Sequence, residues 1–392
     1  MAAARSPRFT LHIDPVLALL VAILLLLGLT MMTSASVAVA ERTMGSPLYY
    51  LQRQSVFLVL ALFGAGVFLL IPTRFWAVSG FLSLTVALLL LIVVLLPGIG
   101  HTVNGATRWI DLGPMNFQVS EVARLLMFFY ICSYLVRHGD AMRQSLMGFA
   151  RPMLFVFVAC ALLLVEPDFG AATVLLGTTL VVMFIGGVRL RDYALLVIVA
   201  ISAMVVLILT SPYRLKRFLG FLEPFDDPYD SGFQLTQSLI AIGRGEWTGV
   251  GLGASVQKLH YLPEAHTDFV FAVMAEELGL IGTVIVVALF FALVARGFAI
   301  ARRAARHKLM FQSYLAYTLV TWFALQSFIN IGVNMGILPT KGLTLPMVSY
   351  GGSSLIATLA SVALLLRVHH ETHAVEKAAL SATRVDSRGP MQ

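Results

Sequence analysis

The chain has 392 residues, of which 59% are hydrophobic and 12% are charged. This balance excludes a soluble domain, because a soluble fold could not bury so much apolar surface. The net charge of +7 does not indicate nucleic-acid binding, because the basic residues fall in short segments between long apolar stretches. Both cysteines, Cys132 and Cys160, lie inside such stretches. We therefore expect buried thiols rather than a disulfide framework or a metal cluster.

The N-terminus resembles a secretory signal. A basic segment precedes an apolar run that starts at Pro15, and Ala38-Val39-Ala40 resembles a cleavage site. The run extends to Met32, which is longer than the usual signal core of roughly 7–15 residues. We therefore expect a cytoplasmic segment at 1–14, followed by an uncleaved first membrane span.

Ten stretches are long and apolar enough to cross a membrane, which takes about 20 residues of helix. They lie at residues 15–36, 54–71, 76–96, 118–136, 146–165, 169–188, 192–210, 269–296, 311–336 and 350–367. Ten spans place both termini on one side. If that side is the cytoplasm, most of the 27 Lys and Arg residues lie inside, including the cluster Arg302, Arg303, Arg306 and Lys308.

The predicted fold class is therefore an all-α polytopic membrane protein with both termini in the cytoplasm. One ten-span membrane domain covers residues 15–367, and a flexible cytoplasmic tail covers 368–392. A large outer loop at 210–268 separates spans seven and eight. Loops of this length are uncommon and usually functional, so we look for chemistry there and at the neighbouring span ends.

Two basic residues in outer loops oppose the orientation rule. Arg108 lies beside Trp109, which could anchor its loop at the membrane interface, and Lys341 lies between Pro339 and Pro346. Each basic side chain is either simply solvated or directed at an anionic partner. The sequence leaves both interpretations open.

Glu121 and Arg124 are three residues apart at the outer end of span four, so they share one helix face within pairing distance. They form either a structural ion pair or a charged site that directs Arg124 toward an anion in an outer cavity.

The segment Glu166-Pro167-Asp168-Phe169-Gly170 joins spans five and six abruptly. A helix from Arg151 to Val165 is about 22 Å long, shorter than the hydrocarbon core of roughly 30 Å. The segment is therefore either a tight hairpin whose acids cap the next helix or a polar site recessed below the outer surface.

Within the outer loop, residues 231–242 predict a short helix on the membrane surface, with Ser231 as its N-cap and Gly243 as its stop. A glycine-rich run follows, at positions 243, 245, 249, 251 and 253. It predicts either ordinary turns or a loop that cradles a phosphate group.

Asp268 lies where this loop enters span eight. Asp is a preferred N-cap, and capping would lower its pKa and make it a poorer base. Span eight itself is overlong, so we expect its first turns to project and to place Glu276 and Glu277 near the outer interface. Gly279 and Gly282 would allow a bend there.

Span nine carries three amides spaced four residues apart, Gln326, Asn330 and Asn334, so one helix face is lined by amide groups. Interhelical hydrogen bonds account for such a face.

Five motifs, in this order along the chain, resemble the SEDS family (shape, elongation, division and sporulation). They are Arg108-Trp109-Ile110-Asp111-Leu112-Gly113, Gln118 to Arg124, Glu166 to Gly170, Pro263 to Phe269, and Pro346 to Ser354. The resemblance covers about residues 52–367. Gln234 to Ser238 and Lys341 are similar to the division branch (FtsW-like) rather than the elongation branch. Val119 stands where the family often has Pro, and Arg124 where it often has Lys, which replaces a point charge with a planar fork.

The resemblance implies a peptidoglycan glycosyltransferase that polymerises lipid II at the outer face of the plasma membrane. A sugar hydroxyl of one lipid-linked disaccharide would attack the anomeric carbon of another and expel undecaprenyl pyrophosphate. This step needs a base and nearby cations. By resemblance Asp268 is the base. The candidate substrate-binding residues are Glu121, which would hold Arg124 in place, and the cations Arg108, Arg124, Arg244 and Lys341.

The resemblance also implies partners: a class B penicillin-binding transpeptidase and other division proteins at the septum. We expect no cofactor and no metal-ligand cluster, although pyrophosphate chemistry often recruits a divalent ion. Two other functions remain. A lipid II flippase would use the outer charges as way stations, and a non-catalytic scaffold would recruit the transpeptidase. The acids cluster at the outer ends of the spans, which favours chemistry at the surface.

Overall fold

The structure is a computed structural model that describes residues 11–386 except 104, 112, 114–115, 227–231, 260 and 341. In this part of the chain, eight helices are long and apolar enough to cross a membrane: α1 (Pro15–Met44), α2 (Tyr49–Leu70), α5 (Val119–Gln144), α6 (Leu146–Val165), α8 (Leu190–Leu209), α11 (Val270–Arg306), α12 (Met310–Asn334) and α13 (Gly352–Asp386). Two shorter apolar helices are α4 (Gly80–Val94) and α7 (Phe169–Ile185). Every predicted span corresponds to one of these ten helices, and the number that crosses the membrane stays a prediction.

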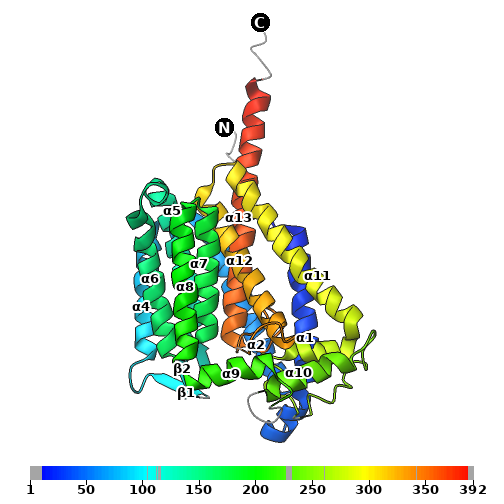
Figure 1. Ribbon diagram of the computed structural model, residues 1–392. Coiled ribbons are helices and arrows are strands. Elements are labelled where there is room, and N and C mark those ends of the chain that lie inside the picture. Colours follow the sequence, from blue (N-terminus) through cyan, green and yellow to red (C-terminus); the bar gives the residue numbers. More distant parts are fainter. Residues whose placement is uncertain are drawn as a thin grey trace.

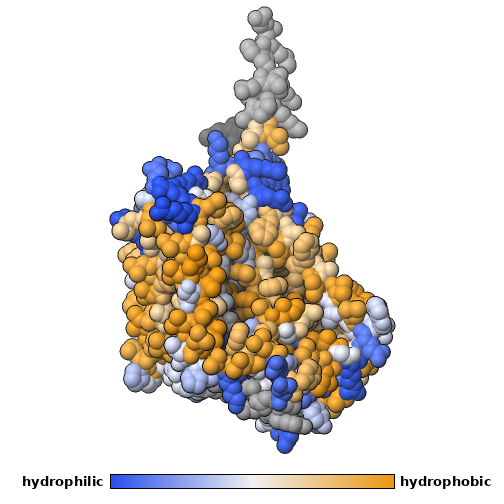
Figure 2. All heavy atoms as spheres, in the orientation of Figure 1, coloured by the Kyte–Doolittle hydropathy of each residue, from blue (hydrophilic) through white to orange (hydrophobic). Residues whose placement is uncertain are grey.

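The surface confirms a polytopic membrane protein. A broad belt of apolar residues crosses the middle of the face in view, and hydrophilic residues gather above and below it (Figure 2). The ends of α11 and α13 lie above the belt, whereas the strands and the helices α9 (Pro212–Leu222) and α10 (Phe233–Arg244) lie below it (Figure 1). The basic cluster at the end of α11 and the long loop are therefore on opposite sides, as the orientation rule predicts.

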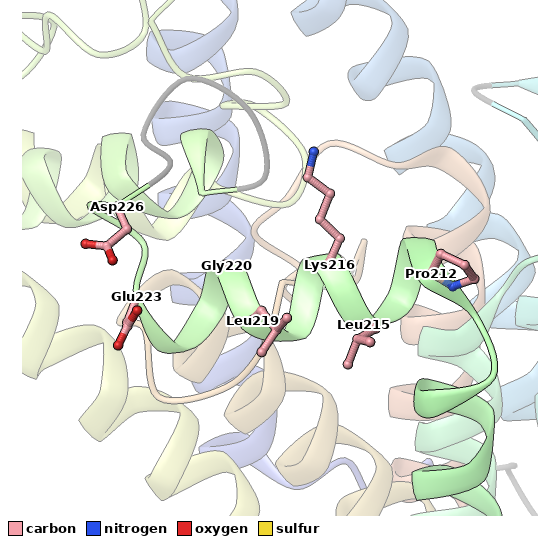
Figure 3. A pocket seen from close by; sticks show the side chains of 7 residues that line it. All are labelled: Pro212, Leu215, Lys216, Leu219, Gly220, Glu223 and Asp226. Carbon is pink, nitrogen blue, oxygen red and sulfur yellow. The ribbon is translucent and has the colours of Figure 1, made fainter.

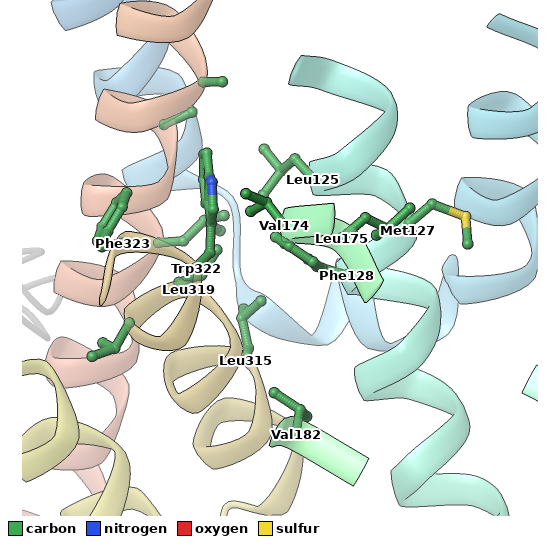
Figure 4. Packing of buried hydrophobic residues seen from close by; sticks show 14 of the residues in the cluster. Leu125, Met127, Phe128, Val174, Leu175, Val182, Leu315, Leu319, Trp322 and Phe323 are labelled. Atoms are coloured by element: carbon green, nitrogen blue, oxygen red, sulfur yellow. The ribbon is translucent and has the colours of Figure 1, made fainter. Parts of the chain in front are cut away.

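The core lies around α5, α12 and α13, whose apolar windows are mostly buried, whereas α8 is almost entirely exposed. Phe128 of α5 packs 5.9 Å from Trp322 of α12, measured between ring centroids, beside Leu175 of α7 (Figure 4). Burial from lipid gains little hydrophobic free energy, so packing and hydrogen bonds must hold such helices together. This explains why the helices richest in polar residues lie at the centre. Cys132 and Cys160 are both buried and unpaired, as predicted.

Three features of the fold differ from the predicted elements. Residues 100–118 form an antiparallel sheet of three short strands, β1 (Gly100–Val103), β2 (Ala106–Asp111) and β3 (Asn116–Gln118), where only a loop was expected. A helix, α9, follows α8 directly. Another short helix, α3 (Thr73–Val78), precedes α4. β1 and β3 have only four and three residues, and β2 does not alternate strictly between apolar and polar side chains, so none carries a clear strand pattern.

The flexible tail predicted from residue 368 is instead helical as far as Asp386, because contacts with α1 and α11 order this part of α13. The Nδ1 atom of His369 lies 3.4 Å from Asp14, which also caps α1 and pairs with Arg296. Further along, Glu376 accepts hydrogen bonds from Arg303. Residues 387–392 lie outside the described part of the chain.

The predicted surface helix is present as α10, which ends at Arg244 rather than at Gly243. Its proposed cap, Ser231, lies outside the described residues, and Gly232 is the N-cap. α11 begins one residue later than predicted and is longer, with a break at Gly279, where φ is 67°. The expected bend is therefore present.

The glycine-rich segment inserts into the break in α11. The N–H groups of Val250 and Gly251 donate to the carbonyls of Glu276 and Glu277, at 2.9 and 3.2 Å. On the other side of the break, the N–H of Leu280 donates to the carbonyl of Glu246 at 2.9 Å. The loop thus satisfies backbone groups that the break leaves without helical partners. The segment therefore contains the predicted turns and also packs against the break in α11, and a phosphate-binding role stays a prediction.

Candidate active site

Asp268 lies in the turn that leads into α11, on the outer side of the membrane domain. The turn is held by buried apolar side chains, among them Leu262, Ala265 and Phe269. Phe269 is the N-cap of α11 and makes no side-chain capping bond, so the prediction that Asp268 caps this helix is wrong. The Asp268 side chain is half-buried in this turn.

The loop before α13 lies directly against this turn. A β-carbon on Gly342 would lie 3.1 Å from Oδ2 of Asp268, which is closer than most β-carbons approach a neighbouring atom, so glycine here lets the loop lie close to the carboxylate. Farther along the loop, the N–H of Tyr350 donates to the carbonyl of His266 at 2.9 Å. Lys341, the predicted cation beside Gly342 in the sequence, lies outside the described residues.

Aromatic rings enclose His266, two residues before Asp268. The His266 ring lies 4.6 Å from that of Tyr50 and 5.6 Å from that of Tyr350, between centroids. Burial lowers the pKa of His266 below its usual value, which favours the neutral imidazole. This cluster fixes the turn against α2 and the loop before α13.

The acidic turn between α6 and α7 meets the small sheet. Asp168 caps α7 by accepting from the N–H of Ala171 at 3.0 Å, and it also accepts from the Ser120 hydroxyl at 2.9 Å. Arg108, on β2, reaches Asp168 at 3.8 Å. Asp168 is only 2% exposed, so the turn combines both predicted roles: it caps a helix and it is recessed.

Glu166, in the same turn, is fully buried, and neither carboxylate oxygen has a hydrogen-bond partner within the described residues. Burial, followed by the nearby charge of Asp168, raises the pKa of Glu166 to about 8. A carboxyl group in this setting is neutral near pH 7.

Glu121 and Arg124 form the predicted pair, but they lie inside the bundle. Arg124 donates to Glu121 and is only 2% exposed. Its guanidinium carbon lies 4.5 Å from the centre of the Trp322 ring, at cation–π distance. Of the two interpretations that the sequence left open, this placement fits the structural ion pair better than a group facing an outer cavity.

Arg244, at the end of α10, lies 3.4 Å from Glu276 and is partly exposed. Glu276 and Glu277 were expected near the outer interface, and both are buried within the protein. Glu276 accepts from Ser255, whereas Glu277 accepts from Lys258 at 2.7 Å. These bonds fasten the long loop to α11 where the glycine-rich segment inserts.

The structure thus gathers two of the predicted groups around one loop. Gly342 lies close to the Asp268 carboxylate, and Leu343 lies against the start of α7, where a β-carbon on Gly170 would be 2.8 Å from its side chain. The Asp268 turn and the Arg108–Asp168 pair therefore lie on either side of loop 342–345. Arg124 lies beneath this arrangement, and Arg244 belongs to the attachment of the long loop.

An outer cavity of about 410 Å³ lies along α9 and includes none of the predicted site residues. In Figure 3 the side chain of Lys216 projects to one side of α9, and those of Leu215 and Leu219 project to the other. In the described ranges, no group of three or more His, Cys, Asp or Glu side chains is arranged to hold a metal ion.

Residues 15–374 match the family model for FtsW, RodA and SpoVE, described as a cell cycle protein. The chain belongs to the FtsW/RodA/SpoVE family. This is the SEDS family that the motifs indicated, and the match includes both the Asp268 turn and loop 342–345.

Curated relatives of this family are close in sequence. The chain is 54% identical over 378 residues to a Thioalkalivibrio sulfidiphilus protein named "Probable peptidoglycan glycosyltransferase FtsW", which covers 96% of this chain and 94% of that protein. A Legionella pneumophila protein of the same name is 49% identical, over 89% of this chain and 88% of its own length. These names confirm the division branch.

Two solved structures share the fold. One chain of a peptidoglycan synthase complex, described as coordinating polymerization and crosslinking, has a TM-score of 0.75 and 32% identity, over 93% of this chain and 99% of that one. The Thermus thermophilus rod shape determining protein RodA has a TM-score of 0.68 and 31% identity, over 93% and 98% of the two chains.

Some residues around this FtsW/RodA/SpoVE site were missed by sequence reasoning. His266 lies within the motif Pro263 to Phe269, but no sequence pattern indicated a role for its ring or for Tyr50. Aromatic side chains at a span end usually indicate interface anchoring, so no local pattern shows that these two rings meet.

Proposed function

We propose that this chain is a peptidoglycan glycosyltransferase that polymerises lipid II into glycan strands at the outer face of the plasma membrane during cell division. The observation that carries the proposal is the position of Asp268. Its carboxylate lies at the outer end of the bundle, against the loop that continues from Lys341. The names of the curated relatives support the same activity.

In the proposed reaction, the Asp268 carboxylate accepts the proton of a sugar hydroxyl while that oxygen bonds to the anomeric carbon of a second lipid-linked disaccharide. The bond from this carbon to the pyrophosphate oxygen breaks, and undecaprenyl pyrophosphate leaves with the bonding electrons. Cations beside the leaving group would stabilise its charge. Arg108 and Lys341 stay candidates for this role, whereas Arg124 is buried and Arg244 pairs with Glu276.

We further propose that the protein works with a class B penicillin-binding transpeptidase and other division proteins at the septum. The solved synthase complex supports a partner of this kind. A requirement for a divalent cation stays a prediction, and polymerisation measured with EDTA and then with added Mg²⁺ would test it.

The test is a polymerisation assay on purified protein in vesicles with labelled lipid II, with and without the transpeptidase. Asp268→Asn should abolish glycan strands, because the amide cannot accept the hydroxyl proton. Glu41→Gln, which removes an exposed outer carboxylate elsewhere, should leave synthesis unchanged. Strand synthesis that survives Asp268→Asn would contradict the proposal. Translocation of lipid II without polymer would favour the flippase. Absence of both polymerisation and translocation would favour the scaffold.

A further inference from the structure

Three buried amides on α12 face the two segments of the candidate active site. One of them, Asn334, also makes an interhelical hydrogen bond of the kind that was expected, to the first turn of α11. Gln326, Asn330 and Asn334 are at most 2% exposed. Their side chains are one helical turn apart, so they form a row along the outer half of α12. We call these three residues the amide row.

Asn330 bridges the two segments directly. Its Nδ2 group donates to the backbone carbonyl of Asp268 at 2.9 Å and to the backbone carbonyl of Leu343 at 2.6 Å. One amide therefore uses both of its N–H bonds to join the turn that carries Asp268 to loop 342–345.

Asn334 and Gln326 extend the row on either side. Nδ2 of Asn334 also donates to the Asp268 carbonyl, at 3.0 Å, and its Oδ1 accepts from the N–H of Ala272 at 3.1 Å. Asn334 thus holds the Asp268 turn and the first turn of α11 together.

Nε2 of Gln326 donates to the carbonyl of Thr344 at 2.9 Å. Its Oε1 accepts from the indole N–H of Trp322 at 2.6 Å, on the ring that Arg124 covers. The buried Glu121–Arg124 pair is therefore connected to loop 342–345 through Trp322 and Gln326.

We infer that the amide row consists of positioning residues, which hold the Asp268 carboxylate and loop 342–345 in one fixed relative placement for glycosyl transfer. The inference rests on the proposed function. Two peptide segments that meet outside helices and sheets lack regular backbone hydrogen bonds, so their buried carbonyls need donors from elsewhere. The amide row supplies these donors from a rigid helix. A shift of about 1 Å in such a group can cost on the order of 100-fold in rate.

The test compares isosteric variants that replace the N–H donors of an amide with a carboxylate oxygen. Asn330→Asp places a carboxylate against two carbonyl oxygens, so we expect turnover to fall by roughly 10- to 100-fold while the half-saturating lipid II concentration changes by less than about 3-fold. Asn334→Asp loses one bond to the site, at the Asp268 carbonyl, and one to the Asn330 carbonyl of its own helix, but it keeps its acceptor for Ala272. Its loss of turnover should therefore be smaller. Lowering the pH should restore part of the Asn330→Asp rate relative to wild type, because a protonated carboxyl group donates again.

The matched control is Gln312→Glu on the same helix. Nε2 of Gln312 donates to Thr73 and Glu371 at the opposite end of the membrane domain, so this variant perturbs α12 without touching the site. Its turnover should stay within about 2-fold of wild type. Thermal midpoints in detergent show how far each variant is destabilised. If Asn330→Asp does not fold, Asn334→Asp and Gln326→Glu carry the test.

Wild-type turnover in every amide-row variant that folds would overturn the inference. An equal loss of turnover in Gln312→Glu, at the same thermal midpoint as the amide-row variants, would also overturn it. The same assay separates this from failure of the proposed function. If Asp268→Asn still makes strands, the proposed function fails. If Asp268→Asn is inactive while the amide-row variants are fully active, only the positioning role fails.

Discussion

Gly342 lies so close to the Asp268 carboxylate that a methyl side chain in place of its α-hydrogen would crowd the carboxylate. A methyl group at position 342 would lie 3.1 Å from Oδ2, closer than most side-chain carbons tolerate. The carboxylate must then turn or the loop must shift, and either change moves the base away from its place.

Gly342→Ala should therefore lower polymerisation by about 10-fold or more, since small displacements of a reacting group are costly. The loss should appear in turnover, measured with labelled lipid II. Gly64→Ala is the control, because a β-carbon there meets nothing within 4 Å. Equal rates for Gly342→Ala and wild type would show that the carboxylate does not need its present position.

Glu166 makes stability depend on pH. Its pKa is raised from 4.5 to about 8 in the folded protein, so the folded state keeps a proton that the unfolded state loses. The stability contributed by this group is fully present below about pH 4.5 and is lost as the pH rises toward 8. A glutamine would remove this dependence.

The thermal midpoint of wild type in detergent should therefore fall relative to that of Glu166→Gln as the pH rises from about 5 to 8. Other groups titrate in both proteins, so their effect cancels in the difference between the two thermal midpoints. A constant difference across this range would mean that Glu166 ionises normally.

At the scale of elements, the insertion of the glycine-rich segment into α11 is the main device. Gly249 has φ of 81°, and a β-carbon there would collide with the carbonyl of Glu277. The segment can therefore approach the broken helix only with glycine at this position.

Gly249→Ala should destabilise the protein by roughly 2–4 kcal/mol, through positive φ and collision together. Gly243→Ala, in α10 with open space around it, should be neutral or slightly stabilising. Thermal midpoints and the rate of proteolysis within the long loop measure both effects. Equal stability of the two variants would contradict the insertion.

The sequence predicts an element well where a long apolar stretch or a clear periodicity identifies it. The helices α6, α7 and α12 begin and end within a few residues of the predicted spans. The sheet at 100–118 was missed because its strands are short, and the α11 insertion because its hydrogen bonds join Val250 to Glu276, far apart in sequence. Asp268 was assigned by resemblance, whereas its amide contacts depend on which way α12 turns in the bundle.

For the whole molecule, the apolar belt and the distribution of charges predict one orientation in the membrane. Two positions test it. Glu41 is exposed near the end of α1 on the side of the long loop, and Lys308 is exposed after α11 on the opposite side. The native thiols of Cys132 and Cys160 are buried, so background labelling should be low.

In intact cells or right-side-out vesicles, Glu41→Cys should react with a membrane-impermeant maleimide and Lys308→Cys should not. Inside-out vesicles should reverse the pattern. The opposite result would place Asp268 in the cytoplasm, where strand synthesis at the outer face could not use it.

The most direct measurement of the central claim is the distance from position 268 to the acceptor sugar in an experimental structure of Asp268→Asn with lipid II bound. We predict that the side chain at 268 lies within about 2.6–3.2 Å of the attacking hydroxyl, with loop 342–345 beside the pyrophosphate. A bound headgroup whose hydroxyl lies beyond the reach of residue 268, even through one water, would contradict the account.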